Sequence, residues 1–185
     1  MQAPQVAHKF AQALVGLAGE KGILEPVRQA AEELREVVRV QELQLFLKHP
    51  RPAAQDKKMV LQRVIPDYAP PEFRNFINII IDRRRESLLL SIMEVLIDLI
   101  IEAQGFLIVE LISAQPLTEM ERASIRQNLE RIWQAKVYLK YRENSGLIGG
   151  VMIRRGDQIS DGSLAGQLKS LKQFLIEKTN ISFGF

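Results

Sequence analysis

Apolar residues recur every three or four positions through the first hundred residues, the spacing of helices that bury one face. The first such face comprises Val6, Phe10, Ala13, Leu14 and Leu17. Gly19 and Gly22 are expected to end that helix. Further helices are predicted over residues 25–40, 43–47 and 55–64. In the last of these, the pattern predicts that Met59, Val60 and Val64 are buried.

Two more helices are predicted after the paired prolines at positions 70 and 71, because proline suits the first turn of a helix. The apolar face of the fifth helix comprises Phe73, Phe76, Ile77, Ile80 and Ile81. The sixth, predicted over residues 87–104, contains the apolar run LLLSIMEVLIDLII. That run is about 14 residues long, shorter than the roughly 20 that span a bilayer. Glu94 and Asp98 lie on one polar stripe, which is more typical of the solvated edge of a core helix than of an acid–base pair.

The period changes after Gly105, where residues rich in branched side chains and alternating polarity predict strands over 106–113 and 137–142. Between them, Thr118 is a predicted helix N-cap and Glu121 completes a capping box. Strand–helix–strand is therefore expected here.

The glycine-rich stretch Gly146–Leu171 predicts a hairpin followed by a helix. Its two strands are predicted over residues 151–153 and 158–160. Either Asp161 or Ser163 suits the N-cap of the helix that follows. The whole order predicts a mainly α (α+β) fold. Residues 1–105 are expected to form an N-terminal six-helix bundle, and residues 106–185 a small strand/helix C-terminal domain.

No residue pattern predicts catalysis, a metal site or a bound cofactor. The chain has no cysteine, which excludes disulfides, thiolate metal sites and cysteine nucleophiles. His8 and His49 have no carboxylate at ligand or triad spacing, so surface histidines are expected. The glycines at 146, 149 and 150 lack the lysine of a phosphate loop and precede a strand, which favours a tight strand entry over a nucleotide site.

Charge is uneven along the chain. Residues 1–105 hold 14 Lys+Arg and 14 Asp+Glu, whereas residues 106–185 hold 11 and 8, so the net +3 lies in the second part. The sharpest basic run, Arg83 to Arg85, is flanked by Asp82 and Glu86. Two interpretations stay open: a contact to phosphate or an acidic partner helix, or the solvated end of the fifth helix.

Three stretches resemble one family, the δ subunit of bacterial and chloroplast-type F-type ATP synthases, which is similar to the mitochondrial oligomycin-sensitivity-conferring protein. AHKFAQALVGLA resembles its first helix, with Phe10 where the family usually has tyrosine. NFINIIIDRRRESLLLSIMEVL resembles the junction of its fifth and sixth helices. GGVMIRRGDQISDGSLAGQLKSL resembles its C-terminal signature, except that Ser160 replaces an aliphatic residue. The resemblance covers nearly the whole chain.

The resemblance implies a non-catalytic stator subunit of the peripheral stalk, present in one copy per complex. Its N-terminal bundle would grip the N-terminal helix of an α subunit between the first and fifth helices. Carried onto this sequence, the candidate contact residues are Phe10, Ala13, Leu14, Ile77 and Ile81. An equally open interpretation is that these five are plain bundle core. The C-terminal domain would bind the C-terminal ends of the b and b′ subunits, and no nucleic acid is expected.

The implied location is peripheral, on the cytoplasmic face of the plasma membrane or the stromal or cytoplasmic face of a thylakoid membrane. The opening residues MQAPQVAHKFAQAL lack the apolar core of a signal peptide, which agrees with that expectation. The alternative function is a small basic nucleic-acid-binding protein that uses the Arg83–Arg85 run with Lys169 and Lys172.

Overall fold

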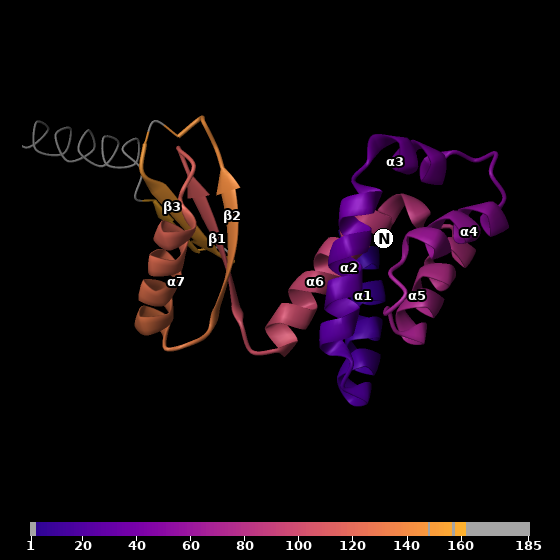
Figure 1. Cartoon of the computed structure of the whole chain (residues 1–185), viewed down its shortest axis with the longest axis horizontal. Helices are drawn as coiled ribbons and strands as arrows, with labels where there is room; N and C mark the ends of the chain where they lie inside the picture. The colour runs from indigo at the N-terminus through magenta and orange to yellow at the C-terminus, as the bar shows by residue number, and fades with distance from the viewer. Residues whose placement is uncertain (1–2, 148, 157, 162–185) are drawn as a thin grey trace, which may run out of the picture. The chain divides into compact units, whose positions relative to one another are not determined.

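The structure, a computed structural model, describes residues 3–147, 149–156 and 158–161, and the chain divides into two compact units, residues 1–104 and 105–185. The helices of the first unit are α1 (Ala3–Lys21), α2 (Leu24–Val38), α3 (Gln41–Lys48), α4 (Ala54–Val64), α5 (Pro71–Asp82), the 3₁₀ turn η1 (Glu86–Leu88) and α6 (Leu89–Ala103). The second unit contains β1 (Leu107–Ser113), α7 (Glu119–Trp133), β2 (Val137–Glu143), β3 (Val151–Arg155) and β4 (Gln158–Asp161). The mainly helical fold class with a small sheet is confirmed (Figure 1).

Helix α6 is the apolar centre of the first unit. Its buried side chains are Leu89, Ile92, Met93, Leu96, Ile97, Ile100 and Ile101. Helices α1 and α2 run alongside it, and η1 leads into it (Figure 1). The prediction of a core helix is therefore confirmed. Within the described part of the chain, no helix is long and apolar enough to cross a membrane.

A tight helix-ending motif joins α5 to η1. The Arg85 amide donates to the Ile80 carbonyl at 2.9 Å, and the Arg84 amide donates to the Ile81 carbonyl at 2.8 Å. This pair of bonds defines a Schellman motif, whose left-handed residue is usually glycine. Here Arg84 takes that position with φ 54°. Residues 86–88 form the 3₁₀ turn η1, so α6 begins at Leu89, later than the sequence predicts.

Two adjacent lysines tie α4 to the α5–η1 turn. Lys57 Nζ donates to the Leu47 carbonyl at 2.7 Å and pairs with Glu86 at 2.6 Å. The side chains of this pair are 5% and 15% exposed. Lys58 pairs with Asp82 at 2.6 Å, nearer the surface. Both carboxylates that flank the arginine run are therefore held by lysines of α4.

The predicted buried face of α4 was wrong. Met59 is 49% exposed, and Val60 and Val64 are only half-buried. The buried residues are instead Lys57 and Leu61. This face buries Leu61 completely, and the partly buried Glu86 carboxylate and the Leu47 carbonyl offset the cost of burying the Lys57 charge beside it.

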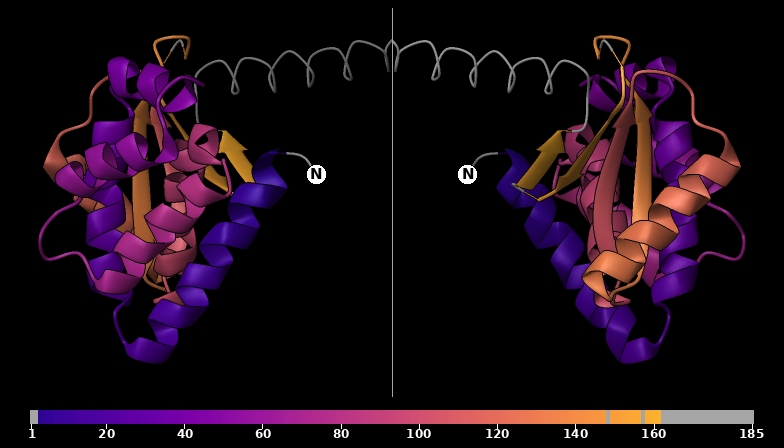
Figure 2. Two further views of the ribbon diagram at one scale, coloured as in Figure 1. Left: turned by 90° about the vertical axis from the view of Figure 1, so that its right-hand side faces the viewer. Right: turned by 90° about the vertical axis from the view of Figure 1, so that its left-hand side faces the viewer.

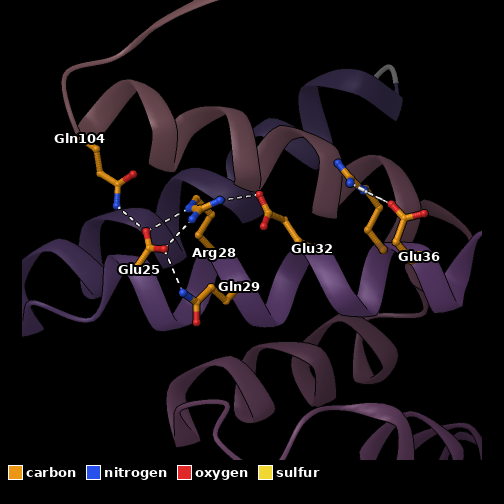
Figure 3. Close-up of polar contacts among 7 residues, drawn as sticks. Glu25, Arg28, Gln29, Glu32, Glu36 and Gln104 are labelled. Carbon is orange, nitrogen blue, oxygen red and sulfur yellow. Dashed lines mark hydrogen bonds and ion pairs between the residues drawn. The ribbon is translucent and has the colours of Figure 1, made fainter. Parts of the chain in front are cut away.

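A polar cluster fastens the start of α2 to the end of α6 (Figure 3). Both oxygens of Glu25 accept hydrogen bonds from Arg28, at 2.5 and 3.0 Å. Gln104 donates to Glu25 at 3.0 Å, and Arg28 also reaches Glu32 at 2.6 Å. The Arg28 hydrogen bonds, helped by Gln104, lower the pKa of Glu25 to about 2.

The described part of the second unit, up to residue 161, is a four-stranded sheet with one helix packed on it (Figure 2). The strand order is β2-β1-β3-β4, with β1 and β2 parallel and the other neighbours antiparallel. Helix α7 connects β1 to β2, as parallel strands require. The core of this unit comprises Val109, Leu129 and Val137, and four partly buried side chains pack around them: Ile125, Trp133, Leu139 and Ile153.

The capping box and the hairpin predicted from the sequence of this unit are both present in the structure. The Glu121 amide donates to Thr118 Oγ1 at 3.2 Å and the Thr118 amide to Glu121 at 2.8 Å, so the predicted capping box is confirmed. The predicted hairpin corresponds to β3 and β4. Gly150 at its entry has φ 81°, which fits a tight strand entry. The helix predicted after residue 161 lies outside the described residues.

Substituting Glu25→Gln tests the α2–α6 cluster. Because the pKa of Glu25 is held near 2, below its ordinary value of 4.5, the ionised form stabilises the fold fully above about pH 5 and loses this effect as pH falls towards 2. Glu25 is 46% exposed, so a loss of roughly 1 kcal/mol at pH 7 is expected. Urea unfolding should show the gap from the natural chain shrinking between pH 5 and pH 2. A gap that does not change with pH would contradict the assignment, and Glu20→Gln on the surface is the control.

Substituting Lys57→Met tests the buried pair. It leaves the Glu86 carboxylate buried without its cation, and one oxygen of Glu86 already lacks a hydrogen-bond partner. A loss of about 3 kcal/mol is expected, partly recovered by a second change, Glu86→Gln. The adjacent substitution Lys58→Met breaks an exposed pair and should cost less than about 1 kcal/mol. Thermal unfolding checks both, and equal losses at the two lysines would refute the burial of the Lys57–Glu86 pair.

Candidate functional site: a groove between α1 and α5

The described residues do not assemble a catalytic constellation. No group of three or more histidine or acidic residues in this part of the chain is placed to hold a metal ion. His8 and His49 are both exposed. Glu94 lies on the exposed side of α6 and pairs with Arg39 of the α2 end at 3.6 Å.

Helix α1 carries two apolar stripes side by side. The buried stripe comprises Ala7, Ala11, Leu14 and Ala18, each at most 3% exposed. The second stripe, partly or fully exposed, comprises Val6, Phe10, Ala13 and Leu17. Small side chains let two helices approach closely, so the alanines allow α1 to pack tightly on α6. The larger apolar residues of α1 are consequently left at the surface.

The first part of the exposed stripe of α1 and the C-terminal part of α5 with the turn after it line a groove of about 530 Å³. Val6, Phe10 and Ile79 supply its apolar lining. The rings of Phe10 and Phe76 meet edge to face, with centroids 6.4 Å apart. From Val6 to Leu17 the stripe extends about 16 Å, or three helical turns. The groove and the exposed stripe that continues from it together present an apolar surface of this length, which suits a single amphipathic helix.

The two ends of the exposed apolar stripe differ in charge. At the end formed by the last turn of α1, Lys21 Nζ lies 2.5 Å from a Glu72 oxygen, and this hydrogen bond lowers the pKa of Glu72. At the opposite end, Lys9, Arg83 and Arg85 line the groove. These three side chains make no ion pair with any described residue. The stripe therefore runs from an ion pair at one end to a cluster of cations, unpaired among the described residues, at the other.

The predicted contact residues divide between surface and core. Ala13 is exposed and Phe10 half-buried, so both are accessible: Phe10 lines the groove, and Ala13 continues the same stripe beyond it. Leu14, Ile77 and Ile81 are 3%, 0% and 2% exposed and pack beneath the surface, which fits the interpretation as bundle core. A docked helix would meet Phe10 and Ala13 directly, and the three buried residues would act by holding the walls in place.

Sequence reasoning missed Ile79, which is 49% exposed and lines the groove. The sequence nevertheless contains a pattern that could have identified this residue. The five apolar residues at 73, 76, 77, 80 and 81 already complete a core stripe, and all five are buried as predicted. An isoleucine off that stripe has no place in the core, so its apolar side chain marks a surface that is apolar beyond the needs of folding.

The second unit offers a different surface. Strand β2 lies at one edge of the sheet, where one row of backbone groups has no neighbouring described strand. Beside it, the Arg122 guanidinium lies 5.0 Å from the Tyr141 ring centre, and the Tyr141 hydroxyl accepts from the Leu117 amide at 2.9 Å. On α7, Met120 and Ile132 are 84% and 68% exposed. These groups can pair or pack with a partner, and they include no nucleophile held by a base.

The comparisons with a family model, with related sequences and with solved structures agree with one another. The model of the ATP synthase delta (OSCP) subunit family matches residues 6–175. The chain is 34% identical over 171 residues to ATP synthase subunit delta of Nostoc punctiforme, covering 91% of this chain and 93% of the relative. It is 32% identical over 174 residues to the subunit of the same name from Carboxydothermus hydrogenoformans, covering 94% and 98%. Among solved structures, a chain in the Toxoplasma gondii mitochondrial ATP synthase has a similar fold, with TM-score 0.72, 21% identity and coverage of 92% and 97%.

Paired leucine substitutions test the two stripes of α1. Ala11→Leu adds bulk where α1 packs in the core, and a loss of about 1–3 kcal/mol is expected from overpacking. Ala13→Leu adds the same atoms at the exposed groove wall and should leave the free energy of unfolding nearly unchanged. Chemical unfolding of both variants measures the difference. A larger loss for Ala13→Leu than for Ala11→Leu would reverse the assignment of core and groove.

Proposed function

This chain belongs to the ATP synthase delta (OSCP) subunit family, and from that membership we propose that it joins the catalytic head of the enzyme to the b subunits. The family's subunit is a non-catalytic component of the peripheral stalk of F-type ATP synthase, so this chain is not an enzyme. A stator must hold the head still while the rotor turns. Long-lived protein contacts meet that need, and an active site does not contribute to it.

The proposed partner of the first unit is the N-terminal helix of an α subunit, docked in the groove between α1 and α5. The support is the exposed apolar stripe, because Val6, Phe10, Leu17 and Ile79 remain at a surface after the core is complete. Apolar anchors spaced one helical turn apart are what an amphipathic helix supplies in return. The groove is the observation that carries this proposal.

We also propose that helices α1 to α6 behave as one six-helix bundle, so that force applied at the groove reaches the whole unit. The fully apolar centre at α6 supports this, as does the Glu25–Gln104 contact that fastens the last helix to the second. A docking site placed on such packed helices changes little when it is loaded, because tightly packed interiors have low compressibility.

The second unit is proposed to bind the C-terminal ends of the b and b′ subunits. Its net charge supports an acidic partner, since residues 106–185 hold 11 Lys+Arg against 8 Asp+Glu. The edge strand β2 and the exposed Met120 and Ile132 add pairing and apolar surface. One copy per complex is proposed, because a second copy would need a second stalk to bind.

As a subunit of a membrane-bound complex, the chain is peripheral to the membrane. We propose that it lies on the cytoplasmic face of a plasma membrane, or the stromal or cytoplasmic face of a thylakoid membrane, where the catalytic head is. The similar proteins give no support to the nucleic-acid-binding alternative. Of the residues that suggested it, Lys169 and Lys172 lie outside the described part of the chain.

Binding of an α-subunit peptide to the full chain tests this function. A synthetic peptide of the α-subunit N-terminal helix should bind, and Ala13→Glu should weaken binding by about tenfold or more by placing a carboxylate in an apolar groove wall. Gln12→Glu adds the same charge at an exposed position about 100° around α1 from Ala13, off the apolar stripe, and should leave the affinity unchanged. Isothermal calorimetry measures both. Absence of binding by the natural chain, or equal weakening by the two variants, would count against the groove as the docking site.

A further inference from the structure

The three consecutive arginines of the α5–η1 turn point to two different places. Arg83 and Arg85 line the α1–α5 groove. Arg84 lines a separate pocket on the other side of the turn, together with Lys48 and Arg51. The Schellman motif separates them, because its left-handed residue at φ 54° reverses the chain between the two flanking arginines. The turn thus delivers two of its three charges to one end of the groove.

The charges that reach the groove are not neutralised locally. In the sequence, Asp82 and Glu86 flank the arginine run and leave an excess of one positive charge. In the fold, Lys58 and Lys57 of α4 hold these two carboxylates at 2.6 Å each. Each acidic residue is therefore already paired, and the positive charges of the arginines are left over.

Other groups at this end of the groove add further positive charge. Lys9 of α1 lines the groove beside Arg83 and Arg85. The positive end of the α1 dipole also lies here, since α1 begins at Ala3. The C-terminal carbonyls of α5 oppose this with about half a negative charge. Three full cations outweigh that half charge, so the end of the groove at Arg83 is electropositive.

We propose that this basic end recognises carboxylates of the docked helix and so fixes its direction in the groove. The partner is an amphipathic helix whose apolar stripe is about three turns long and whose acidic side chains are gathered at the end that lies over Arg83 and Arg85. This inference rests on the proposed docking of a helix in the groove. The apolar stripe carries no charge that distinguishes the two directions of a docked helix. The charges at its two ends do distinguish them, because the last turn of α1, at the opposite end, carries the paired Lys21 and Glu72.

Arginine is well suited to this role. Its planar guanidinium binds a carboxylate through two parallel hydrogen bonds, which adds geometric specificity to the attraction. Charges at the rim of an interface mainly set orientation and association rate, while apolar burial supplies most of the affinity. Phe10 and Ile79 would thus hold the helix, and the two arginines would select its direction.

The test compares the double variant Arg83→Glu/Arg85→Glu with Arg84→Glu in the full chain, using the synthetic α-subunit N-terminal peptide as probe. Calorimetry at low salt should show about tenfold or greater weakening for the double variant and less than about twofold for Arg84→Glu. The affinity of the double variant should also depend less steeply on salt. Replacing the acidic residues at one end of the peptide by lysine should restore its binding to the double variant, and replacing those at the other end should not.

Direction is read separately with spin labels. The chain has no cysteine, so Ser87→Cys provides a single labelling position beside the arginine turn. Distances from that label to a second label should be shorter when the second sits on the acidic end of the peptide. Equal distances from both ends, or equal affinity of the natural chain and the double variant, would overturn the inference while leaving docking intact. No binding by the natural chain would overturn the docking proposal and this inference together. Circular dichroism establishes that the variants fold, and Lys9→Glu repeats the charge test without altering the turn.

Discussion

The arrangement of the first unit depends on covering α6. This helix buries seven large apolar side chains, so apolar surface must enclose it on most sides. Helix α1 meets it through a stripe that is mostly alanine, which permits close packing. Because alanine fills the contact, the bulkier Phe10 and Leu17 are free to face outward. The need to bury α6 and the presence of an apolar groove on α1 are therefore linked: the same helix serves the core with small residues and the surface with large ones.

The packing of α4 also determines which charges are left unpaired at the α5–η1 turn. Burying the Lys57 amine requires a nearby carboxylate, and Glu86 meets that requirement. Lys58 engages Asp82 in the same way at the surface. These internal pairs stabilise the packing of α4, and they also remove the acidic neighbours of the arginine run. A structural requirement inside the unit thus leaves a basic end on the groove outside it.

A subunit built in this way suits a passive role in a rotary enzyme. The described residues offer an apolar groove, an exposed sheet edge and charged rims, all of which are means of holding other proteins. Each surface is supported by packed elements: the groove by buried Leu14, Ile77 and Ile81, and the edge strand by α7. Membership of the ATP synthase delta (OSCP) subunit family accounts for this combination, since a stalk subunit works by resisting force between partners.

Local signals in the sequence determined most of the elements and the family. The capping box at Thr118, the core stripe of α5, the burial of α6 and the glycine-rich hairpin were all predictable, because each depends on residues close together in the chain. Tertiary structure alone decided which of two adjacent stripes on α1 is core, which face α4 buries and which cations hold Asp82 and Glu86. These choices depend on partners distant in sequence. The spacing of apolar residues locates an apolar face to within about one residue. Which of two adjacent stripes is buried depends on the contact with another helix, and that contact forms only when the helices pack.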